Sequence, residues 1–237
     1  MTAGQGGGAA AAPSPPSAGR RRAARKPSAL AVTGLAAAIA CLAAGVGLLL
    51  YAGYRIWDPG ARGAQRLMTA KLHAEWSEQH GGGLRPITLR VGQPFATIQI
   101  PAFGANWQFS IVEGTALSQL ATGPGHVTGT ALPGTPGNFA VAAHDITAGN
   151  PFLHLGRLRR GDSVIIQTAD GTYRYAVGSE TVVRYTDALV LAPVPGHPGV
   201  APTAQYITLI TCTPVTLDFT PWRVVVTGKL VKATPRS

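Results

Sequence analysis

The stretch YITLITC, residues 206–212, is an apolar run rich in β-branched side chains that ends on a cysteine. Its length and composition predict a strand, and the proline two residues after the cysteine predicts a turn. The chain of 237 residues has one other cysteine, Cys41, far away in the sequence. We therefore expect Cys212 to be an unpaired thiol at a strand end, with simple packing as a small buried hydrophobe as the alternative.

Similar short runs extend from about residue 86 to the C-terminus, divided by Gly, Pro and Asp. The expected strands are 96–100, 107–112, 139–144, 163–168, 173–177, 181–185, 206–212 and 223–231. ADGT at 169–172 predicts a hairpin, and Asn150 followed by Pro151 predicts the start of a short helix. About eight short strands with few helices predict a mainly β domain over residues 89–237, either a barrel or a sandwich.

The N-terminal part of the chain has a different composition. Residues 1–28 are rich in Gly, Ala, Pro and Ser and include a basic cluster at 20–26, so they predict a disordered tail. Residues 29–54 carry no charged side chain and exceed the roughly 20 apolar residues that a transmembrane helix needs. Residues 55–88 are expected to form a juxtamembrane linker with a helix at 64–80, ended by the glycines at 81–83.

The basic cluster also predicts the location of the protein. It supplies five of the positive charges behind the formal net charge of +10, and the first acidic residue is Asp58. The positive-inside rule then keeps the tail in the cytoplasm and places the β domain outside a single-pass anchor in the cell membrane. This explanation of the charge removes the need for a nucleic-acid partner. The alternatives are a cleaved signal peptide, whose apolar core is usually only about 7–15 residues long, or a lipoprotein site at AIAC around Cys41.

A cysteine nucleophile needs a partner that moves protons and a group that stabilises an oxyanion. His144 ends the apolar run FAVAAH, as Cys212 ends its own run, so both are expected at strand ends beside loops. Arg223 opens the last strand and returns close to Cys212 if the two strands are antiparallel neighbours. His126 lies in a Gly-rich stretch, as a pocket wall or as a turn residue. A zinc site of His126, His144 and Cys212 has enough ligands but lacks any paired ligand spacing.

These residues lie in motifs that resemble the sortases, the cell-wall cysteine transpeptidases, and most closely the class E sortases of actinobacteria. TLITC at 208–212 is similar to the signature Thr-Leu-x-Thr-Cys, and residues 123–145 are similar to the block that leads to the catalytic histidine. NPFLHLGRLRRGD at 150–162 and LAPVP at 191–195 resemble two further family segments. The resemblance covers about residues 90–232 and implies a closed eight-stranded β-barrel with short helices, preceded by a single transmembrane helix.

The resemblance also implies the chemistry. His144 corresponds to the catalytic histidine, Cys212 to the nucleophile and Arg223 to the arginine that supports the oxyanion, while His126 and Thr211 are candidates for substrate contacts. The thiolate of a thiolate–imidazolium pair would cleave the Thr–Gly bond of a Leu-Pro-x-Thr-Gly or Leu-Ala-x-Thr-Gly type sorting signal at the C-terminus of a surface protein. An amine of a cell-wall precursor or of a pilin would then accept the acyl group. No metal or organic cofactor is implied.

Three positions depart from the class E pattern. Asp145 stands where arginine is common, Val127 where tyrosine is frequent, and Thr213 where asparagine is frequent. All three are expected to flank the substrate groove, so the preferred sorting motif stays open; Asp145 either orients His144 or is a solvated loop carboxylate. Two other functions fit part of the pattern: a membrane-tethered barrel that binds a wall ligand without catalysis, and a cysteine hydrolase that releases the peptide with water.

Overall fold

The structure is a computed structural model that describes residues 29–57, 59–78, 87, 89–213 and 220–236. The expected tail at 1–28 and the glycines at 81–83 lie outside these residues. Two helices come first, α1 (Ala29–Trp57) and α2 (Pro59–Glu78). Contacts divide the chain into two units, Met1–Gly47 and Leu48–Ser237, and the second unit contains the whole β domain.

Helix α1 contains the segment Ala36–Tyr54, which is apolar, with a mean hydropathy of 2.0. By length and composition this segment can cross a bilayer, as the expected span at 29–54 requires. A signal sequence near an N-terminus would meet the same criteria.

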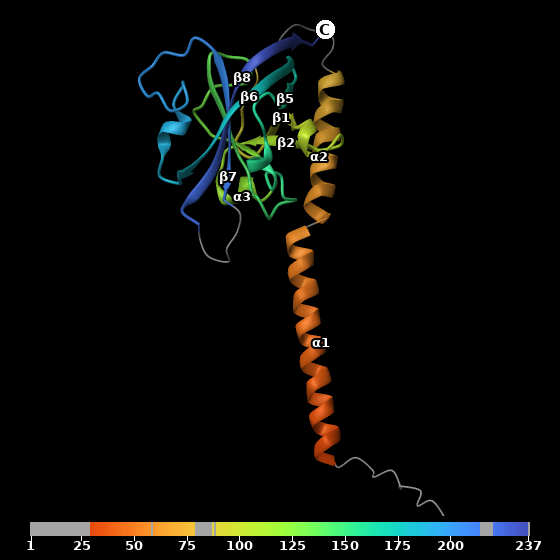
Figure 1. The fold of residues 1–237 in the computed structure, drawn as a ribbon. Coiled ribbons are helices and arrows are strands. Elements are labelled where there is room, and N and C mark those ends of the chain that lie inside the picture. The colour runs from red at the N-terminus through yellow and green to blue at the C-terminus, as the bar shows by residue number, and fades with distance from the viewer. Residues whose placement is uncertain (1–28, 58, 79–86, 88, 214–219, 237) are drawn as a thin grey trace, which may run out of the picture. The chain divides into compact units, whose positions relative to one another are not determined.

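The β domain is a closed barrel of eight strands within the described part of the chain (Figure 1). The strands are β1 (Pro94–Gln99), β2 (Gln108–Glu113), β3 (Gly125–His126), β4 (Gly137–Ala142), β5 (Ser163–Thr168), β6 (Gly171–Arg184), β7 (Gln205–Cys212) and β8 (Trp222–Pro235). Around the barrel their order is β1-β2-β3-β4-β7-β8-β6-β5. The pairs β2–β3 and β4–β7 are parallel, and the other neighbours are antiparallel. The barrel, rather than the sandwich, is therefore the architecture.

The barrel interior is filled by apolar side chains. Ile98, Ile111, Phe139, Ile166 and Leu209 have no exposed surface. They come from five different strands. Alternate residues of each strand point inward, so each of these strands contributes side chains to the core. A ligand must therefore bind at the outer surface or at an end of the barrel.

Two strand predictions were wrong in detail. The expected strands at 173–177 and 181–185 are one continuous strand, β6, whose register against β8 shifts between Arg174 and Tyr175 and again between Val177 and Ser179. Such bulges bend a long strand without ending it, so it can follow the barrel wall. Strand β3 was not expected, because two residues in a Gly-rich stretch carry no periodic pattern.

The short helices follow the predictions only in part. The described part of the chain contains helix α3 (Leu117–Leu120) and 3₁₀ turns at η1 (Pro101–Phe103), η2 (Leu155–Arg157) and η3 (Ala188–Leu191). The prediction of a helix that begins at Asn150 was wrong. Asn150 has a left-handed backbone with φ of 58°, whereas a helix N-cap needs an extended one.

Polar groups help to hold helix α2 against strand β2. The Gln65 side chain, 2% exposed, accepts a hydrogen bond from the backbone N–H of Ser110 (2.7 Å) and donates one to the carbonyl of Thr122 (2.5 Å). Leu72 and Trp76 are buried, whereas Leu67 of the same helix is 75% exposed.

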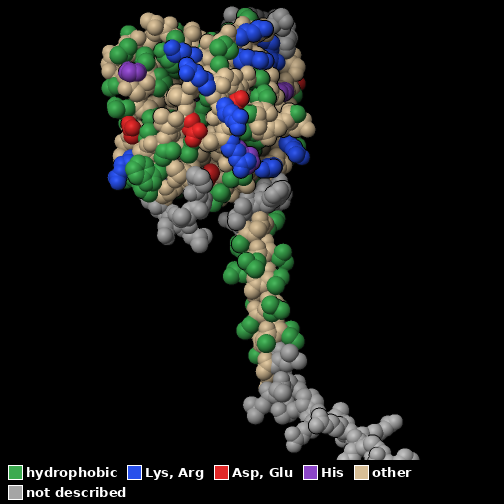
Figure 2. Space-filling model, in the orientation of Figure 1, with side chains coloured by type: hydrophobic (Ala, Val, Ile, Leu, Met, Phe, Trp, Pro, Cys, Tyr) green, Lys and Arg blue, Asp and Glu red, His purple; other side chains and the backbone are tan. Residues whose placement is uncertain are grey.

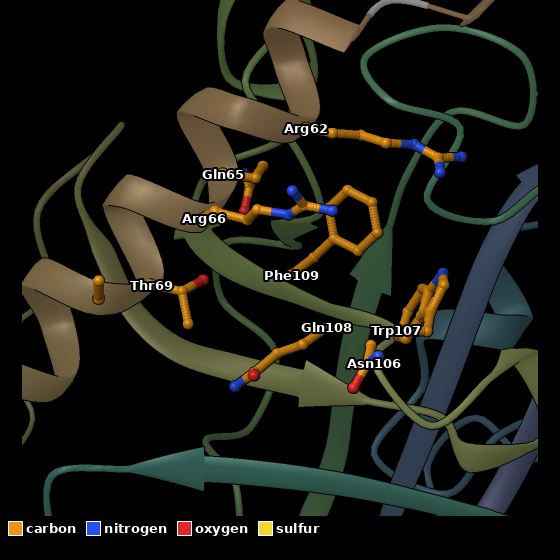
Figure 3. A pocket seen from close by; sticks show the side chains of 9 residues that line it. Arg62, Gln65, Arg66, Thr69, Asn106, Trp107, Gln108 and Phe109 are labelled. Carbon is orange, nitrogen blue, oxygen red and sulfur yellow. The ribbon is translucent and has the colours of Figure 1, made fainter.

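A cavity of about 290 Å³ lies between α2 and β2 (Figure 3). The side chains that face each other across it are Arg62, Gln65, Arg66 and Thr69 from α2 and Asn106, Trp107, Gln108 and Phe109 from the start of β2 and the two residues before it. None of the expected catalytic residues lines this cavity.

Candidate active site

Strands β7 and β8 bring Cys212 and Arg223 together. The two strands are antiparallel, and Cys212 is the direct cross-strand partner of Arg223. Side chains at directly opposed positions stand on the same face of a sheet, about 4.5–5.5 Å apart at Cβ. Arg223 was expected to lie close to Cys212 if their strands were antiparallel neighbours, and this condition is met.

Strands β4 and β7 bring His144 to the same edge. They are parallel neighbours with Ala142 opposite Ile210, so His144 and Cys212 each follow two residues later. The pairing continues past the end of β4, since the N–H of Ala143 donates to the carbonyl of Ile210 (3.0 Å). The Thr211 hydroxyl donates to the carbonyl of Ala143 (2.8 Å) and ties the residue before His144 to the residue before Cys212.

Arg223 is held in place by its own segment. Its Nη1 donates to the carbonyls of Thr220 (2.9 Å) and Trp222 (2.8 Å), and its guanidinium lies over the ring of Tyr185 at 5.8 Å. A guanidinium carries five N–H donors in a fixed plane. The two carbonyls and the ring therefore fix the plane in which the remaining nitrogens lie beside the strand end.

Two cavities adjoin this strand end. The larger one, about 530 Å³, is lined by Thr211, Cys212 and Thr213 together with Asp145 and other residues of the loop after β4. The smaller one, about 190 Å³, is lined by Arg223 and by residues 183–191 at the end of β6 and beyond it. The cysteine thus lines one cavity and the arginine opposite it lines the other.

The local environment opposes ionisation of the cysteine and histidine. Burial raises the pKa of the Cys212 thiol; the Arg223 guanidinium acts to lower this pKa, and the Asp145 carboxylate acts to raise it. Burial lowers the pKa of His144, while the charge of Asp145 acts in the opposite direction. The free protein therefore favours a neutral thiol and imidazole over the thiolate–imidazolium pair that the resemblance implies.

These pKa directions predict the pH dependence of Cys212 alkylation. The thiolate is the reactive form. A raised pKa means that the rate with iodoacetamide should still increase above about pH 8.5, the ordinary pKa of a cysteine. Arg223→Gln removes the stabilising cation, so the midpoint should move further upward. Peptide mapping separates Cys212 from Cys41; a midpoint at or below the ordinary cysteine value would contradict this electrostatic picture.

The loop after His144 has an unusual backbone. Three consecutive residues have left-handed φ values, Ala148 (54°), Gly149 (80°) and Asn150 (58°), and two of them are not glycine. Such conformations cost free energy and persist only where neighbouring groups fix them. One such group is Arg62 of α2, whose Nε donates to the carbonyl of Gly149 (3.1 Å). Helix α2 therefore helps to fix the loop that carries Asp145.

Arg62→Ala is expected to loosen this loop. One hydrogen bond contributes about 0.5–1.5 kcal/mol, so the amides of residues 147–152 should exchange with deuterium roughly 2- to 10-fold faster. The measurement is hydrogen exchange by mass spectrometry on the full chain in detergent. Arg66→Ala is the matched control, because Arg66 lies one turn further along the same helix and lines only the neighbouring cavity. Equal acceleration in both variants would show that Arg62 does not fix the loop.

The structure places His126 away from the Cys212 cavity. Its ring has no exposed surface and stacks on Phe139 inside the barrel. Nδ1 is 2.6 Å from Oε2 of Glu113, and Nε2 is 2.9 Å from the Thr130 hydroxyl. A ring enclosed in this way cannot touch a peptide at the surface, so we assign His126 a structural role.

The other expected positions near the groove separate into two groups. Thr211 and Thr213 line the larger cavity, and Thr213 shares a hydrogen bond of 2.7 Å with the Thr220 hydroxyl. Val127 does not line it; its N–H donates to the carbonyl of Ala140 in β4. Among the residues that the structure describes, no three His, Cys, Asp or Glu side chains are grouped as a metal site would need.

Two glutamates, one beside the buried His126 and one at the larger cavity, were not singled out from the sequence. Glu113, the partner of His126, ends β2, and Glu180 of β6 lines the larger cavity. Acidic residues number only ten in the chain, so a glutamate at the end of an apolar strand was a usable signal for Glu113. The sequence does not indicate that Glu180 lies near the cysteine, because the two residues come together only when the barrel forms.

Comparison with known proteins gives a consistent result. A family model described as the Sortase domain matches residues 98–231. Sortase SrtE1 of Streptomyces coelicolor is 34% identical over 225 residues, which cover 90% of this chain and 62% of that protein, so the chain spans less than two thirds of that relative. Sortase SrtE2 of the same organism is 30% identical over 205 residues, which cover 81% of this chain and 79% of that protein.

Solved structures agree with the barrel. Sortase E from Streptomyces avermitilis aligns with a TM-score of 0.55 and 35% identity, over 62% of this chain and 93% of that one. The SrtF sortase from Corynebacterium diphtheriae aligns with a TM-score of 0.60 and 27% identity, over 66% and 93%.

Proposed function

The chain belongs to the sortase family, and from this premise we propose that it is a cysteine transpeptidase with Cys212 as its nucleophile. The strand-end arrangement of Cys212 opposite Arg223, with His144 on the neighbouring parallel strand, is the observation that carries the proposal. A barrel that only bound a ligand would need none of these three side chains at one edge.

The proposed reaction has two halves. His144 takes the proton of the Cys212 thiol, and the thiolate attacks the threonine carbonyl of a sorting signal. Arg223 donates to the oxyanion, a contribution of about 3–4 kcal/mol when such a donor is pre-positioned. The C–N bond to glycine breaks, His144 returns the proton to the leaving amine, and a thioester remains on Cys212.

The two cavities suggest where the sorting signal lies. The smaller cavity carries Arg223, the group that must reach the carbonyl under attack, together with the apolar residues Ile210, Val190 and Leu191. We assign the residues before the scissile bond to this cavity. Thr211, whose hydroxyl ties β7 to β4, positions the cysteine strand, and its assignment to substrate binding stays a prediction.

The proposed location follows the N-terminal sequence. Residues 1–28 form a cytoplasmic basic tail, 29–54 span the cell membrane once, 55–88 link the span to the barrel, and 89–237 form an extracellular catalytic domain. The partners are surface proteins with a C-terminal sorting signal of the Leu-Pro-x-Thr-Gly or Leu-Ala-x-Thr-Gly type and an amine of a cell-wall precursor or pilin. In this orientation Cys212 lies outside the cell, where cysteines commonly form disulfides. A role as the nucleophile explains why this cysteine is unpaired.

The test is a transfer assay on the full chain in detergent. A library of peptides varied around Leu-x-x-Thr-Gly is incubated with triglycine, and mass spectrometry identifies the products. The proposal predicts an amide between the threonine carbonyl and triglycine, and the winning peptides identify the motif. Peptides cleaved only by water would identify a hydrolase, and peptides returned intact by a folded barrel would favour the non-catalytic wall binder.

A further inference from the structure

Aromatic rings lie against cationic side chains at several places on this protein. Carboxylates are scarce, since the chain has 10 acidic residues against 20 Lys and Arg, and Lys and Arg side chains predominate over Asp and Glu on the face drawn in Figure 2. The cation–aromatic pairs in the described part of the chain include Arg184 over Trp222 (5.3 Å), Arg223 over Tyr185 (5.8 Å), Lys229 over Tyr206 (5.3 Å) and Arg236 over Trp76 (4.9 Å). One of these pairs, Arg223 with Tyr185, lies beside the cysteine.

The sheet itself places Tyr185 beside Arg223. Tyr185 directly follows strand β6, in which Val183 is the direct cross-strand partner of Arg223. The pairing continues past the end of β6, since the N–H of Tyr185 donates to the carbonyl of Pro221 (2.8 Å). Residues two apart on a strand point to the same face, so Tyr185 stands on the face that carries Val183 and Arg223. The position of the ring is therefore set by the pairing of β6 with the segment that leads into β8.

The Tyr185 ring completes the surroundings of the Arg223 guanidinium. Nη1 of Arg223 donates to two carbonyls of its own segment, so the remaining donors of the side chain are those on Nη2 and Nε. Tyr185 and Arg223 both line the smaller cavity, which we assigned to the residues before the scissile bond. A ring against the guanidinium limits how far this side chain can swing away from the strand end, and so keeps the remaining donors beside that cavity.

Trp222, the sequence neighbour of Arg223, does not give this support. Neighbouring residues of a strand point to opposite faces of the sheet. The Trp222 ring instead lies under the guanidinium of Arg184, its direct cross-strand partner. Tyr185 is thus the aromatic side chain that the fold pairs with Arg223.

We propose that Tyr185 is a positioning residue of the reaction, whose ring holds the Arg223 guanidinium where it donates to the oxyanion and faces the thiolate. In this role Tyr185 acts through Arg223. The catalytic part of the inference rests on the proposed transpeptidase function. The effect of Tyr185 on the Cys212 thiol, transmitted by Arg223, can be measured without that function.

The first test is the alkylation of Cys212 by iodoacetamide as a function of pH, on the full chain in detergent. Arg223 acts to lower the pKa of this thiol, and a guanidinium that has lost its ring lies further from the sulfur on average. Tyr185→Leu should therefore move the midpoint upward, in the same direction as Arg223→Gln and by a smaller amount. Tyr185→Phe keeps the ring and should leave the midpoint at the wild-type value.

The second test is acylation by a preferred sorting peptide, with the maximal rate and the half-saturating peptide concentration determined separately. Tyr185→Leu should lower the maximal rate about 3- to 30-fold, which corresponds to about 0.6–2 kcal/mol, as for loss of a cation–aromatic contact. A ring that only formed part of the cavity wall would instead raise the half-saturating concentration and leave the maximal rate unchanged.

Two comparisons make these tests specific. Tyr206→Leu is the matched control, because it removes the same ring from its pair with Lys229 at the opposite end of β7 from Cys212, and it should change neither measurement. In the Arg223→Gln background, Tyr185→Leu should have almost no further effect, because a residue that acts through Arg223 has nothing left to position. Tyr185 is 57% exposed, so the leucine variant should fold, and circular dichroism checks that it does.

Four outcomes would overturn the inference. They are an unchanged alkylation midpoint in Tyr185→Leu, an unchanged maximal rate of acylation in that variant, an equal loss in Tyr185→Phe, and a full additional loss in the Arg223→Gln background. Failure of the wild-type chain to be acylated by any peptide is a different result, because it would overturn the proposed function. The alkylation midpoints would then still decide whether Tyr185 holds Arg223 beside Cys212.

Discussion

Cys212→Ala is expected to reduce transfer of a sorting peptide to triglycine by about 10⁴-fold or more, to the background rate, because removal of a covalent nucleophile eliminates the whole pathway. The fold should be unaffected, since Cys212 is only half-buried and the substitution removes one sulfur atom from the end of a strand. The measurement is the amide product per unit time, with circular dichroism as the check on folding.

Cys41→Ala is the matched control for this prediction. Cys41 is the other cysteine of the chain and lies in the apolar segment of α1. This variant should transfer the peptide at the wild-type rate. Retained transfer in Cys212→Ala, or loss of transfer in Cys41→Ala, would show that the nucleophile had been assigned to the wrong residue.

His126→Ala is expected to cause the largest loss of stability, about 3–5 kcal/mol, because it leaves one member of a buried pair behind. Glu113 is 3% exposed and would keep only the Thr128 hydroxyl as a side-chain partner. The stacked contact with Phe139 would be lost as well. For a domain of this size the midpoint of thermal unfolding should fall by at least about 6 °C.

His197→Ala is the control, since His197 is exposed in the segment between β6 and β7. Its unfolding midpoint should match that of the wild type. The same two variants also test the substrate role first expected for His126. At a temperature where both are folded, the Michaelis constant for the peptide should be unchanged in His126→Ala; an increase with an unchanged midpoint would return His126 to the substrate site.

Much of the barrel was predictable because its strands carry their own pattern. Strand β5 begins and ends where the sequence predicts, since SVIIQT alternates between buried and half-buried positions and is followed by a turn. Strand β6 was divided in two because Gly178 and the polar residues after it read as a break. In the barrel only Gly178 forms a bulge, and the polar residues Ser179 and Glu180 pair with β8. Strand β3 consists of two residues, and only their pairing with β2 and β4 defines them as a strand.

The positions proposed as catalytic could be located for a different reason. Cys212 and His144 end apolar runs, so their place beside loops follows from the local sequence. The parallel pairing of β4 with β7, which brings them to one edge, is a property of the whole barrel. The same holds for His126, because its partner Glu113 is on another strand and its burial depends on Phe139.

The loop after His144 contains what the sequence could not indicate. Its left-handed residues include Ala148, a residue type with no preference for that conformation, and the bond from Arg62 to Gly149 joins positions 87 residues apart. Asp145 was visible as a departure from the class E pattern, but the burial of its Oδ2, which has no hydrogen-bond partner among the described residues, follows only from the fold.

The most direct measurement is the intact mass of the full chain after incubation with a preferred sorting peptide and no amine acceptor. If Cys212 is the nucleophile, the mass increases by that of the peptide up to its threonine. Peptide mapping should place the adduct on Cys212, and hydroxylamine should remove it. A peptide that is cleaved without any adduct on Cys212, or a folded barrel that forms no adduct with any peptide of the library, would contradict the proposed transpeptidase.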